Sequence, residues 1–357
     1  MKTKKMWLGL SMALMLVAAG CGNNNAAVKN EAGTGNAPAA ATEAPANAGS
    51  GDSKSYKIAI SQYVEHPSLD ATREGFLAAL KDAGIVEGEN LKVDLQNAQA
   101  DQANNLSIAQ KIAGDKNDLV LGIATSAAQA VVQNVKDTPI LFAAVTDPVD
   151  AKIVSDLEHP GGQVSGASDT NPESINRLMN FIATQFPKVK KLGLVINEGE
   201  PNAVVMADIA KAELDKHGIE LVKAAITNTS EVKQAAESLV GRVDALYITL
   251  DNSVVSGVDS IIQTANDNKL PFFSADRDTV EKGAFATVGF KYFDHGYQVG
   301  EMAVEVLKNG TSPGDMKVKM QEKLDVILNL KAAAAQGIEV TDAMKAEVAD
   351  PANNIIQ

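Results

Sequence analysis

The sequence predicts an α/β protein made of two doubly wound, Rossmann-like lobes, and three observations support this class. Apolar runs of strand length alternate with longer segments of helical period along residues 56–330. Several of these runs are apolar on successive residues, as expected for parallel strands covered by helices on both faces. The pattern also occurs twice, before about residue 169 and again from residue 191. The folded part of the chain has roughly 300 residues, enough for two domains.

The strand candidates are six or seven residues long and fall into two series. Their spacing leaves room for one helix between most neighbours, which favours parallel sheets with crossover helices. The first series comprises residues 56–61, 91–96, 119–124, 139–145 and 163–168. The second comprises residues 191–196, 220–226, 245–250, 271–276, 285–290 and 324–330.

The segments between the strands carry the signals of amphipathic helices. In residues 68–84 the apolar Leu69, Phe76 and Leu80 recur at helical spacing. Pro172 stands at the expected first position of a helix, where its missing N–H costs nothing. Glycine is common just after a helix, and glycines end four of the predicted helices at Gly84, Gly114, Gly218 and Gly310.

The N-terminus has the pattern of a secretory signal peptide over residues 1–20. Three lysines are followed by the apolar run 6–17 and by small residues at 18–20. This run is shorter than the roughly 20 residues of a membrane span. Cys21 is the only cysteine of the chain and follows the small residues directly, so we expect its thiol to be lipidated and the residue to become the new N-terminus after cleavage. The alternative is an ordinary signal peptide with an incidental cysteine.

Residues 21–55 are predicted to be a flexible tether. They consist mostly of Ala, Gly, Asn, Ser, Thr and Pro, with one valine and no aromatic residue. Such a segment cannot bury enough apolar surface to offset its ordering entropy. As a random coil it would span roughly 30 to 35 Å. The folded part should therefore work close to a membrane, with the lipid as its only membrane contact.

Composition and motifs exclude several classes of function. A formal net charge of −13 and a pI near 4.8, without a basic stripe, argue against a nucleic-acid partner. The sequence has no nucleophile elbow, no Walker loop, no His-Glu-x-x-His motif and no dinucleotide fingerprint after the first strand. We therefore expect no catalytic residues, no metal site and no cofactor. A lone pair of acidic residues acting as an enzyme remains an alternative.

Polar residues gather where the predicted strands end. Thr125 and Ser126 follow the strand 119–124 and are expected to cap the helix that begins there. Its N-terminus would favour a ligand carboxylate. Asp147 ends the next strand, and Tyr63 follows the first. Tyr63 offers a ring face for stacking.

The second series of strands has matching polar clusters. Asn197, Glu200 and Asn202 follow one strand, Asp251 and Asn252 another, and Asp276 a third. Each cluster alone fits ordinary loop and cap chemistry. Together they would point into one crevice, because ligands of open α/β sheets bind beyond the carboxyl ends of the strands. The acidic residues there suit a ligand ammonium group.

Several segments together resemble the bacterial ABC-transporter solute-binding lipoproteins of the tryptophan-binding type. They include "LVAAGC", "VEHPSLDATREGF", "IATSAAQA", "PILFAAVTDPVDA", "NEGEPNA", "LYITLDNSVVS" and "PFFSADRDTVEKGAFATVGF", in matching order from the signal peptide to about residue 340. The resemblance implies a non-enzymatic periplasmic-binding-protein fold of type I. It adds Ala127 to the site beside Thr125 and Ser126. At Ala203 the family commonly has serine, so a hydroxyl contact is not expected there.

The resemblance also implies an organisation and partners. The chain would cross between lobes near residues 169–171, 290–292 and 324, a hinge of three segments. Lobe 1 would comprise residues 56–168 and 291–322, and lobe 2 residues 169–290 and 323–357. The expected protein is a monomer, lipid-anchored on the outer face of the cell membrane. It would close on a small carboxylate-bearing ligand, such as an aromatic amino acid, and dock on an ABC permease with its ATPase.

Other ligands and roles are consistent with the same pattern. A sugar or a nucleoside is the main rival to an amino acid. The chain is 4% aromatic, which does not favour a sugar and weakens the aromatic amino acid somewhat. A sensing module that passes ligand occupancy to a signalling partner is the alternative to transport.

Overall fold

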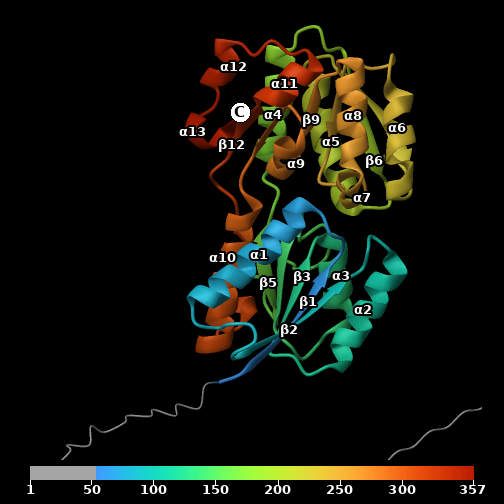
Figure 1. The fold of residues 1–357 in the computed structure, drawn as a ribbon. Coiled ribbons are helices and arrows are strands. Elements are labelled where there is room, and N and C mark those ends of the chain that lie inside the picture. Colours follow the sequence, from blue (N-terminus) through green and yellow to red (C-terminus); the bar gives the residue numbers. More distant parts are fainter. Residues whose placement is uncertain (1–53) are drawn as a thin grey trace, which may run out of the picture. The chain divides into compact units, whose positions relative to one another are not determined.

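The computed structural model describes residues 54–357, in which strands and helices alternate along the chain (Figure 1). The strands form two separate sheets with helices packed against them, which confirms the predicted α/β class. None of the described helices is both long and apolar enough to cross a membrane. The predicted signal peptide, the lipidation site at Cys21 and the tether up to residue 53 lie outside the described residues.

The first sheet has six strands in the order β11-β5-β4-β3-β1-β2, and all neighbouring pairs are parallel. We call this sheet and its helices lobe 1. Its strands are β1 (Tyr56–Gln62), β2 (Leu91–Asn97), β3 (Leu119–Ile123), β4 (Ile140–Val145), β5 (Val164–Ser168) and β11 (Lys319–Met320). Its helices are α1 (Pro67–Asp82), α2 (Gln102–Gly114), α3 (Thr125–Asn134) and α10 (Tyr292–Val304), which continues as a π-helical turn, η2 (Glu305–Asn309), before the short η3 (Pro313–Asp315).

The second sheet has seven strands in the order β13-β12-β10-β9-β8-β6-β7, parallel except between β10 and β12. This sheet and its helices form lobe 2. Its strands are β6 (Lys191–Asn197), β7 (Glu220–Ile226), β8 (Ala245–Ile248), β9 (Phe272–Ser274), β10 (Ala286–Gly289), β12 (Asp325–Asn329) and β13 (Ile355–Ile356). Its helices are α4 (Pro172–Gln185), α5 (Pro201–Lys216), η1 (Thr229–Glu231), α6 (Val232–Leu239), α7 (Asn252–Ser256), α8 (Val258–Asn268), α9 (Arg277–Lys282), α11 (Leu330–Gln336), α12 (Asp342–Ala346) and α13 (Pro351–Asn354).

The chain passes between the two sheets in three short segments. The first lies between β5 and α4, the second between β10 and α10, and the third between β11 and β12. The segments comprise residues 169–171, 290–291 and 321–324. Each of these segments has only two to four residues.

The sequence patterns located every strand of three or more residues in the described part of the chain. All eleven strand candidates correspond to strands of the structure. The two-residue strands β11 and β13 were not predicted, because two residues carry no periodicity. β11 extends the first sheet beside β5, and β13 pairs with β12, so the C-terminal segment belongs to lobe 2.

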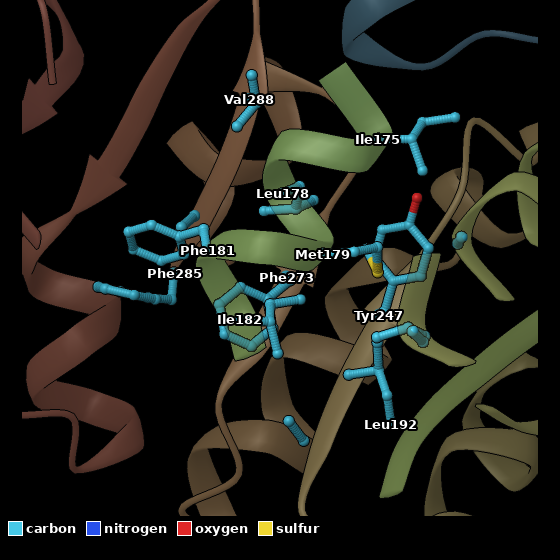
Figure 2. Close-up of a cluster of buried hydrophobic side chains, with 14 of the residues drawn as sticks. Ile175, Leu178, Met179, Phe181, Ile182, Leu192, Tyr247, Phe273, Phe285 and Val288 are labelled. Atoms are coloured by element: carbon cyan, nitrogen blue, oxygen red, sulfur yellow. The ribbon is translucent and has the colours of Figure 1, made fainter. Parts of the chain in front are cut away.

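A core of apolar side chains joins α4 to the second sheet. Figure 2 shows Phe181 and Ile182 of α4 facing Phe273 and Phe285. The rings of Phe273 and Phe285 meet edge to face, with centroids 6.0 Å apart, a favoured arrangement of aromatic pairs. Tyr247 of β8 lies in the same cluster (Figure 2). It is therefore a core residue of lobe 2.

Helices α1 and α10 pack at unusually close range, and glycines permit it. A Cβ atom added at Gly296 would lie 1.8 Å from the carbonyl oxygen of Thr72, and one added at Gly75 would lie 2.0 Å from that of Phe293. Both distances are far below van der Waals contact, so only glycine fits. The contact matters for the site because both helices begin beside it, α1 after His66 and α10 at Tyr292.

Candidate functional site

A small cavity lies between the carboxyl ends of the two sheets, where the folding pattern places ligand sites. Its volume is about 20 Å³, which is room for about one water molecule. Lobe 1 and the crossing segments contribute His66, Ser68, Leu69, Ala144, Thr146, Asp169 and Tyr292, and lobe 2 contributes Asn202, Leu250, Asn252, Val255 and Asp276.

Two hydrogen bonds join the beginning of α1 to lobe 2 at this cavity. The Ser68 hydroxyl donates to Oδ1 of Asp276 at 3.1 Å. Nε2 of His66 lies 3.3 Å from Oδ1 of Asn252. Since the Asn252 amide nitrogen donates to Glu200, its oxygen faces His66, and the imidazole Nε2–H is the donor. Burial lowers the pKa of His66.

Glu200 is a buried carboxylate that organises the loops of lobe 2. Its side chain is 1% exposed. It accepts hydrogen bonds from the backbone N–H groups of Asn252 and Ser253 at 3.0 and 2.9 Å. It also accepts from the Asn252 amide and the Ser253 hydroxyl, both at 2.6 Å. Four donors compensate the cost of burying this charge.

Asp251 also stabilises these loops of lobe 2 by hydrogen bonds. Its side chain is fully buried and accepts from the backbone N–H of Val254, which caps α7, and from that of Asn197 at the end of β6. Burial, followed by the nearby charge of Glu200, raises the pKa of Asp251 well above its usual value. The Asn197 side chain donates to the Ser253 hydroxyl at 3.1 Å. Glu200, Asp251, Asn252 and Asn197 thus form one network with Ser253.

Two buried acidic residues, Asp169 and Asp276, line the cavity. Burial raises the pKa of Asp169 to about 6, although Tyr292 and Thr170 donate hydrogen bonds to its carboxylate. Asp276 caps α9 through the N–H of Thr279 and is also buried. Burial, then the charge of Asp276, raises the pKa of nearby Asp278 to about 7. No lysine or arginine of residues 54–357 lines the cavity.

Asn202 presents a free acceptor to the cavity. Its amide nitrogen donates to the carbonyl of Leu250 at 2.6 Å, which fixes the orientation of the side chain. Its oxygen Oδ1 is buried and has no hydrogen-bond partner among the described residues. A buried acceptor without a partner is costly, so this atom is suited to receive a donor from a ligand.

The predicted cap at Thr125 and Ser126 is wrong in detail. The N-cap of α3 is Ala124, with φ 79°, and no side chain caps this helix. The Thr125 hydroxyl instead accepts from the backbone N–H of Thr146 at 3.4 Å. The Ser126 hydroxyl is buried without a partner in the described part of the chain, and Ala127 is buried in the core of lobe 1.

Two further predicted residues, Asp147 and Tyr63, do not line the cavity. Asp147 is partly exposed and accepts from the N–H groups of Val149 and Asp150, so it stabilises its own turn. The Tyr63 hydroxyl donates to the carbonyl of Ala100 at 3.1 Å, and its ring is buried. Burial, followed by the charge of Glu200, raises the pKa of Tyr63, which therefore lies within electrostatic range of the lobe 2 network.

Of the predicted residues, Asn202, Asn252 and Asp276 line the cavity directly. His66, Ser68, Thr146, Asp169 and Tyr292 also line it and were absent from the predicted site. The same signal could have found Thr146 and Asp169, which directly follow β4 and β5. His66, Ser68 and Tyr292 instead lie at the beginnings of helices.

Two α/β lobes joined by three short segments, with a polar cavity between their carboxyl edges, define a two-lobed solute-binding protein of the periplasmic type I fold. The sequence matches the family described as ABC transporter substrate binding protein over residues 57–351. The chain belongs to this family.

Relatives with known names or structures agree with this assignment. The chain is 44% identical over 279 residues to the tyrosine-binding protein of Clostridioides difficile, covering 78% of this chain and 80% of that one. It resembles the crystal structure of an ABC domain in complex with L-Trp from Streptococcus pneumonia, with a TM-score of 0.78, 31% identity, and coverage of 85% and 100%.

A second structure bears on the arrangement of the lobes. A ligand-free, open substrate-binding protein from Clostridium difficile is 42% identical over 84% of this chain and 98% of that one, with a TM-score of 0.61. The L-Trp complex is less similar in sequence, at 31%, but more similar in shape, at 0.78. The two lobes described here are therefore arranged more as in that complex than as in the open protein.

Proposed function

We propose that the protein captures an amino acid with an aromatic side chain between its lobes and delivers it to an ABC permease and its ATPase. The observation that carries the proposal is that polar groups of both lobes meet at one cavity, joined there by Ser68 with Asp276 and His66 with Asn252. The names of the tyrosine-binding relative and of the L-Trp complex support the aromatic class.

The cavity wall fits the ammonium group of an amino acid. Asp169 and Asp276 are buried carboxyl groups, and Oδ1 of Asn202 is a buried acceptor without a partner among residues 54–357. An ammonium group has three donors and a positive charge, so it satisfies such acceptors. The absence of lysine and arginine from the described lining also favours a cationic group at this end of the ligand.

We assign the carboxylate of the ligand to helix N-termini of lobe 1. α1 and α3 both begin at this edge of the sheet, and neither has a side-chain cap in the structure. Their first backbone N–H groups have no partners within the helix, and the helix dipole favours an anion. The N-terminus of α3 carries Thr125, Ser126 and Ala127, and that of α1 carries Ser68.

Ligand entry requires the lobes to separate. The cavity of about 20 Å³ is far smaller than a ligand site, which typically measures several hundred Å³. Opening breaks the two hydrogen bonds between α1 and lobe 2. A ligand that contacts both lobes then favours closure through its higher affinity for the closed state. We assign the hinge to the three crossing segments, with lobe 1 as 56–168 and 291–322 and lobe 2 as 169–290 and 323–357.

Calorimetric titration tests the ligand class. We expect saturable one-site binding of L-tyrosine, L-tryptophan or L-phenylalanine to the purified protein. N-acetyl-L-tyrosine and L-tyrosinamide, which lack the ammonium and the carboxylate respectively, should bind at least about tenfold more weakly, the loss of a charged hydrogen bond. The described residues contain no tryptophan, and the chain has only Trp7, so indole fluorescence of L-tryptophan offers a second readout.

Sugars and nucleosides serve as the competing ligands in the same titration. Binding of a neutral sugar with no response to any amino acid would overturn the proposed ligand class. Uptake of labelled ligand by cells, lost on deletion of the protein, separates transport from a sensing role. Retained uptake would contradict delivery to a permease.

The proposed location is the outer face of the cell membrane, with a lipid on Cys21 as the anchor. The signal-like residues 1–20 and the lone cysteine support it. In fractionated cells, the wild-type protein should sediment with membranes, and the Cys21→Ser variant should appear in the soluble extracytoplasmic fraction. Equal membrane association of both proteins would contradict the lipid anchor.

A further inference from the structure

Ala144, near the end of β4, has a backbone conformation that is unusual for its residue type. Its φ is 54°, in the left-handed region that residues other than glycine rarely adopt. The residue is 4% exposed and lines the cavity between the lobes. Strained backbone of this kind persists only where surrounding contacts hold it in place.

The strain coincides with an irregularity of the first sheet. The pairing of β4 with β5 shifts register between Phe142 and Val145. A bulge of this kind leaves one residue outside the hydrogen-bond ladder. The backbone N–H of Ala144 therefore needs another acceptor, because a buried N–H without a partner is costly.

His295 of α10 supplies this acceptor. The N–H of Ala144 donates to Nε2 of His295 at 3.0 Å, across 151 positions of the sequence. The imidazole is fully buried. Nε2 can accept only when it carries no proton, so the ring is the neutral tautomer with its hydrogen on Nδ1. Burial lowers the pKa of His295 to about 4, which keeps the ring neutral at physiological pH.

Two aromatic rings pack near the imidazole. Its centroid lies 5.7 Å from the ring of Phe290 and 6.0 Å from that of Tyr292. Its neighbour Gly296 packs directly against the backbone of α1 at Thr72. The position of His295 is therefore set by the crossing between β10 and α10 and by the α1–α10 contact, both of which lie beside the cavity.

We propose that His295 is a positioning residue for the ligand cavity, which holds Ala144 and, two residues on, Thr146 in place at the end of β4. Ala144, Thr146 and Tyr292 all line the cavity. Because His295 and Tyr292 lie on the same helical turn, one helix fixes the end of β4 and the tyrosine relative to each other. The link to ligand binding rests on the proposed function of this cavity.

Amide hydrogen exchange tests the positioning without any ligand. His295→Phe keeps an aromatic ring of similar size and removes the acceptor, whereas His295→Gln retains an acceptor oxygen at similar reach. We expect the Ala144 amide to be protected in the wild type and in His295→Gln. In His295→Phe its exchange should rise by about tenfold or more, as for loss of one buried hydrogen bond. Equal protection in all three proteins would overturn the proposal.

Ligand affinity tests the consequence for the cavity. The dissociation constant for the amino acid that the wild type binds should increase about tenfold or more in His295→Phe. His295→Gln should stay within about threefold of the wild type. Val299→Ala, a buried apolar change one turn further along α10, is the matched control for lost packing. It should lower the melting temperature and leave the affinity unchanged.

The outcomes separate this proposal from the proposed function. If the wild type binds no amino acid, the ligand class is wrong, and the exchange of the Ala144 amide still decides whether His295 positions it. If binding occurs but Val299→Ala weakens it as much as His295→Phe, His295 contributes packing only and the proposal is overturned.

A measurement on the wild type avoids any folding defect of the variants. Nitrogen-15 NMR of the imidazole at neutral pH should show the His295 proton on Nδ1 and Nε2 as an unprotonated acceptor. A proton on Nε2 would exclude the bond from Ala144 and overturn the proposal.

Discussion

Tyr292 donates a hydrogen bond of 3.0 Å from its hydroxyl to Oδ2 of Asp169. Asp169 lies in the crossing segment that follows β5, and Tyr292 begins α10 directly after the crossing that follows β10. The bond therefore ties two of the three connections between the lobes together. Both groups are buried and line the cavity, so the connections between the lobes and the cavity share these residues.

The buried carboxyl of Asp169 should make stability depend on pH. Burial raises its pKa from 3.8 to about 6, so between these values the folded state binds more protons than the unfolded state. Stability should then decrease as pH rises from 4 to 6, by about 3 kcal/mol for this group. Asn at position 169 can still accept from Tyr292. Asp169→Asn should therefore reduce this decrease and be at least as stable as wild type at pH 7.

Urea denaturation at pH 4.5 and pH 7 measures the effect as a difference between the two proteins, so that the contributions of other acids such as Asp278 cancel. Tyr292→Phe is a useful companion, because it leaves the Asp169 carboxyl buried with one donor fewer. It should enlarge the pH dependence. An identical pH dependence in wild type and Asp169→Asn would show that this carboxyl does not titrate as described.

The hydrogen bond between Ser68 and Asp276 should favour closure of the lobes. Ser68→Ala removes it, and a typical hydrogen bond contributes about 1 kcal/mol. Ligand affinity should therefore fall about fivefold, measured by calorimetry. Ser107→Ala is the control, since the Ser107 hydroxyl only bonds the carbonyl of Ala103 within α2. If both variants bind like the wild type, the bond does not stabilise the closed state.

Glu200 should be essential for the stability of lobe 2. In Glu200→Gln, an amide NH₂ group faces donors from Asn252 or Ser253, so buried groups lose their partners. We expect a loss of about 2 kcal/mol in the free energy of unfolding. Glu198→Gln changes an exposed residue that pairs with Lys223, and should cost less than about 0.5 kcal/mol. Similar losses in the two variants would refute the structural role of Glu200.

The close packing of α1 against α10 should make Gly296 intolerant of a side chain. In Gly296→Ala the new Cβ would lie 1.8 Å from the Thr72 carbonyl oxygen, so the helices must move apart. We expect the free energy of unfolding to decrease by about 3 kcal/mol and the ligand to bind more weakly. Gly114→Ala, where nothing lies within 4 Å of the added Cβ, should be neutral or stabilising by up to ~1 kcal/mol. Denaturation curves that do not distinguish the two variants would contradict the close approach.

The fold class was predictable because its signals are local. Continuous apolar runs such as residues 191–196 predict strands buried on both faces, and Pro172 predicts the start of a helix, which the structure places there. Ligands of open α/β sheets bind beyond the carboxyl ends of the strands, which share one edge of the sheet. This rule located Asn202, Asn252 and Asp276. The same rule also selected Asp147, which stabilises its own turn.

The finer features of the site depend on partners far apart in the sequence. Nothing near Ala144 indicates that a histidine 151 positions later accepts its N–H. The assignment of Thr125 as a helix cap was reasonable for its residue type, but Ala124, with φ 79°, occupies the N-cap position after β3 instead. Glu200 was expected to meet a ligand amine, and the structure shows four donors of lobe 2 already on its carboxylate.

The sequence alone determined the alternation of strands and helices and the two sheets, because hydrophobic period and capping residues act over a few neighbouring positions. It also placed the polar clusters at strand ends. Only the tertiary structure decided which of these clusters meet, because the meeting of Ser68 with Asp276 and of Tyr292 with Asp169 depends on how two lobes pack and cross. Burial then set the charge state of those groups, and burial is a property of the assembled fold.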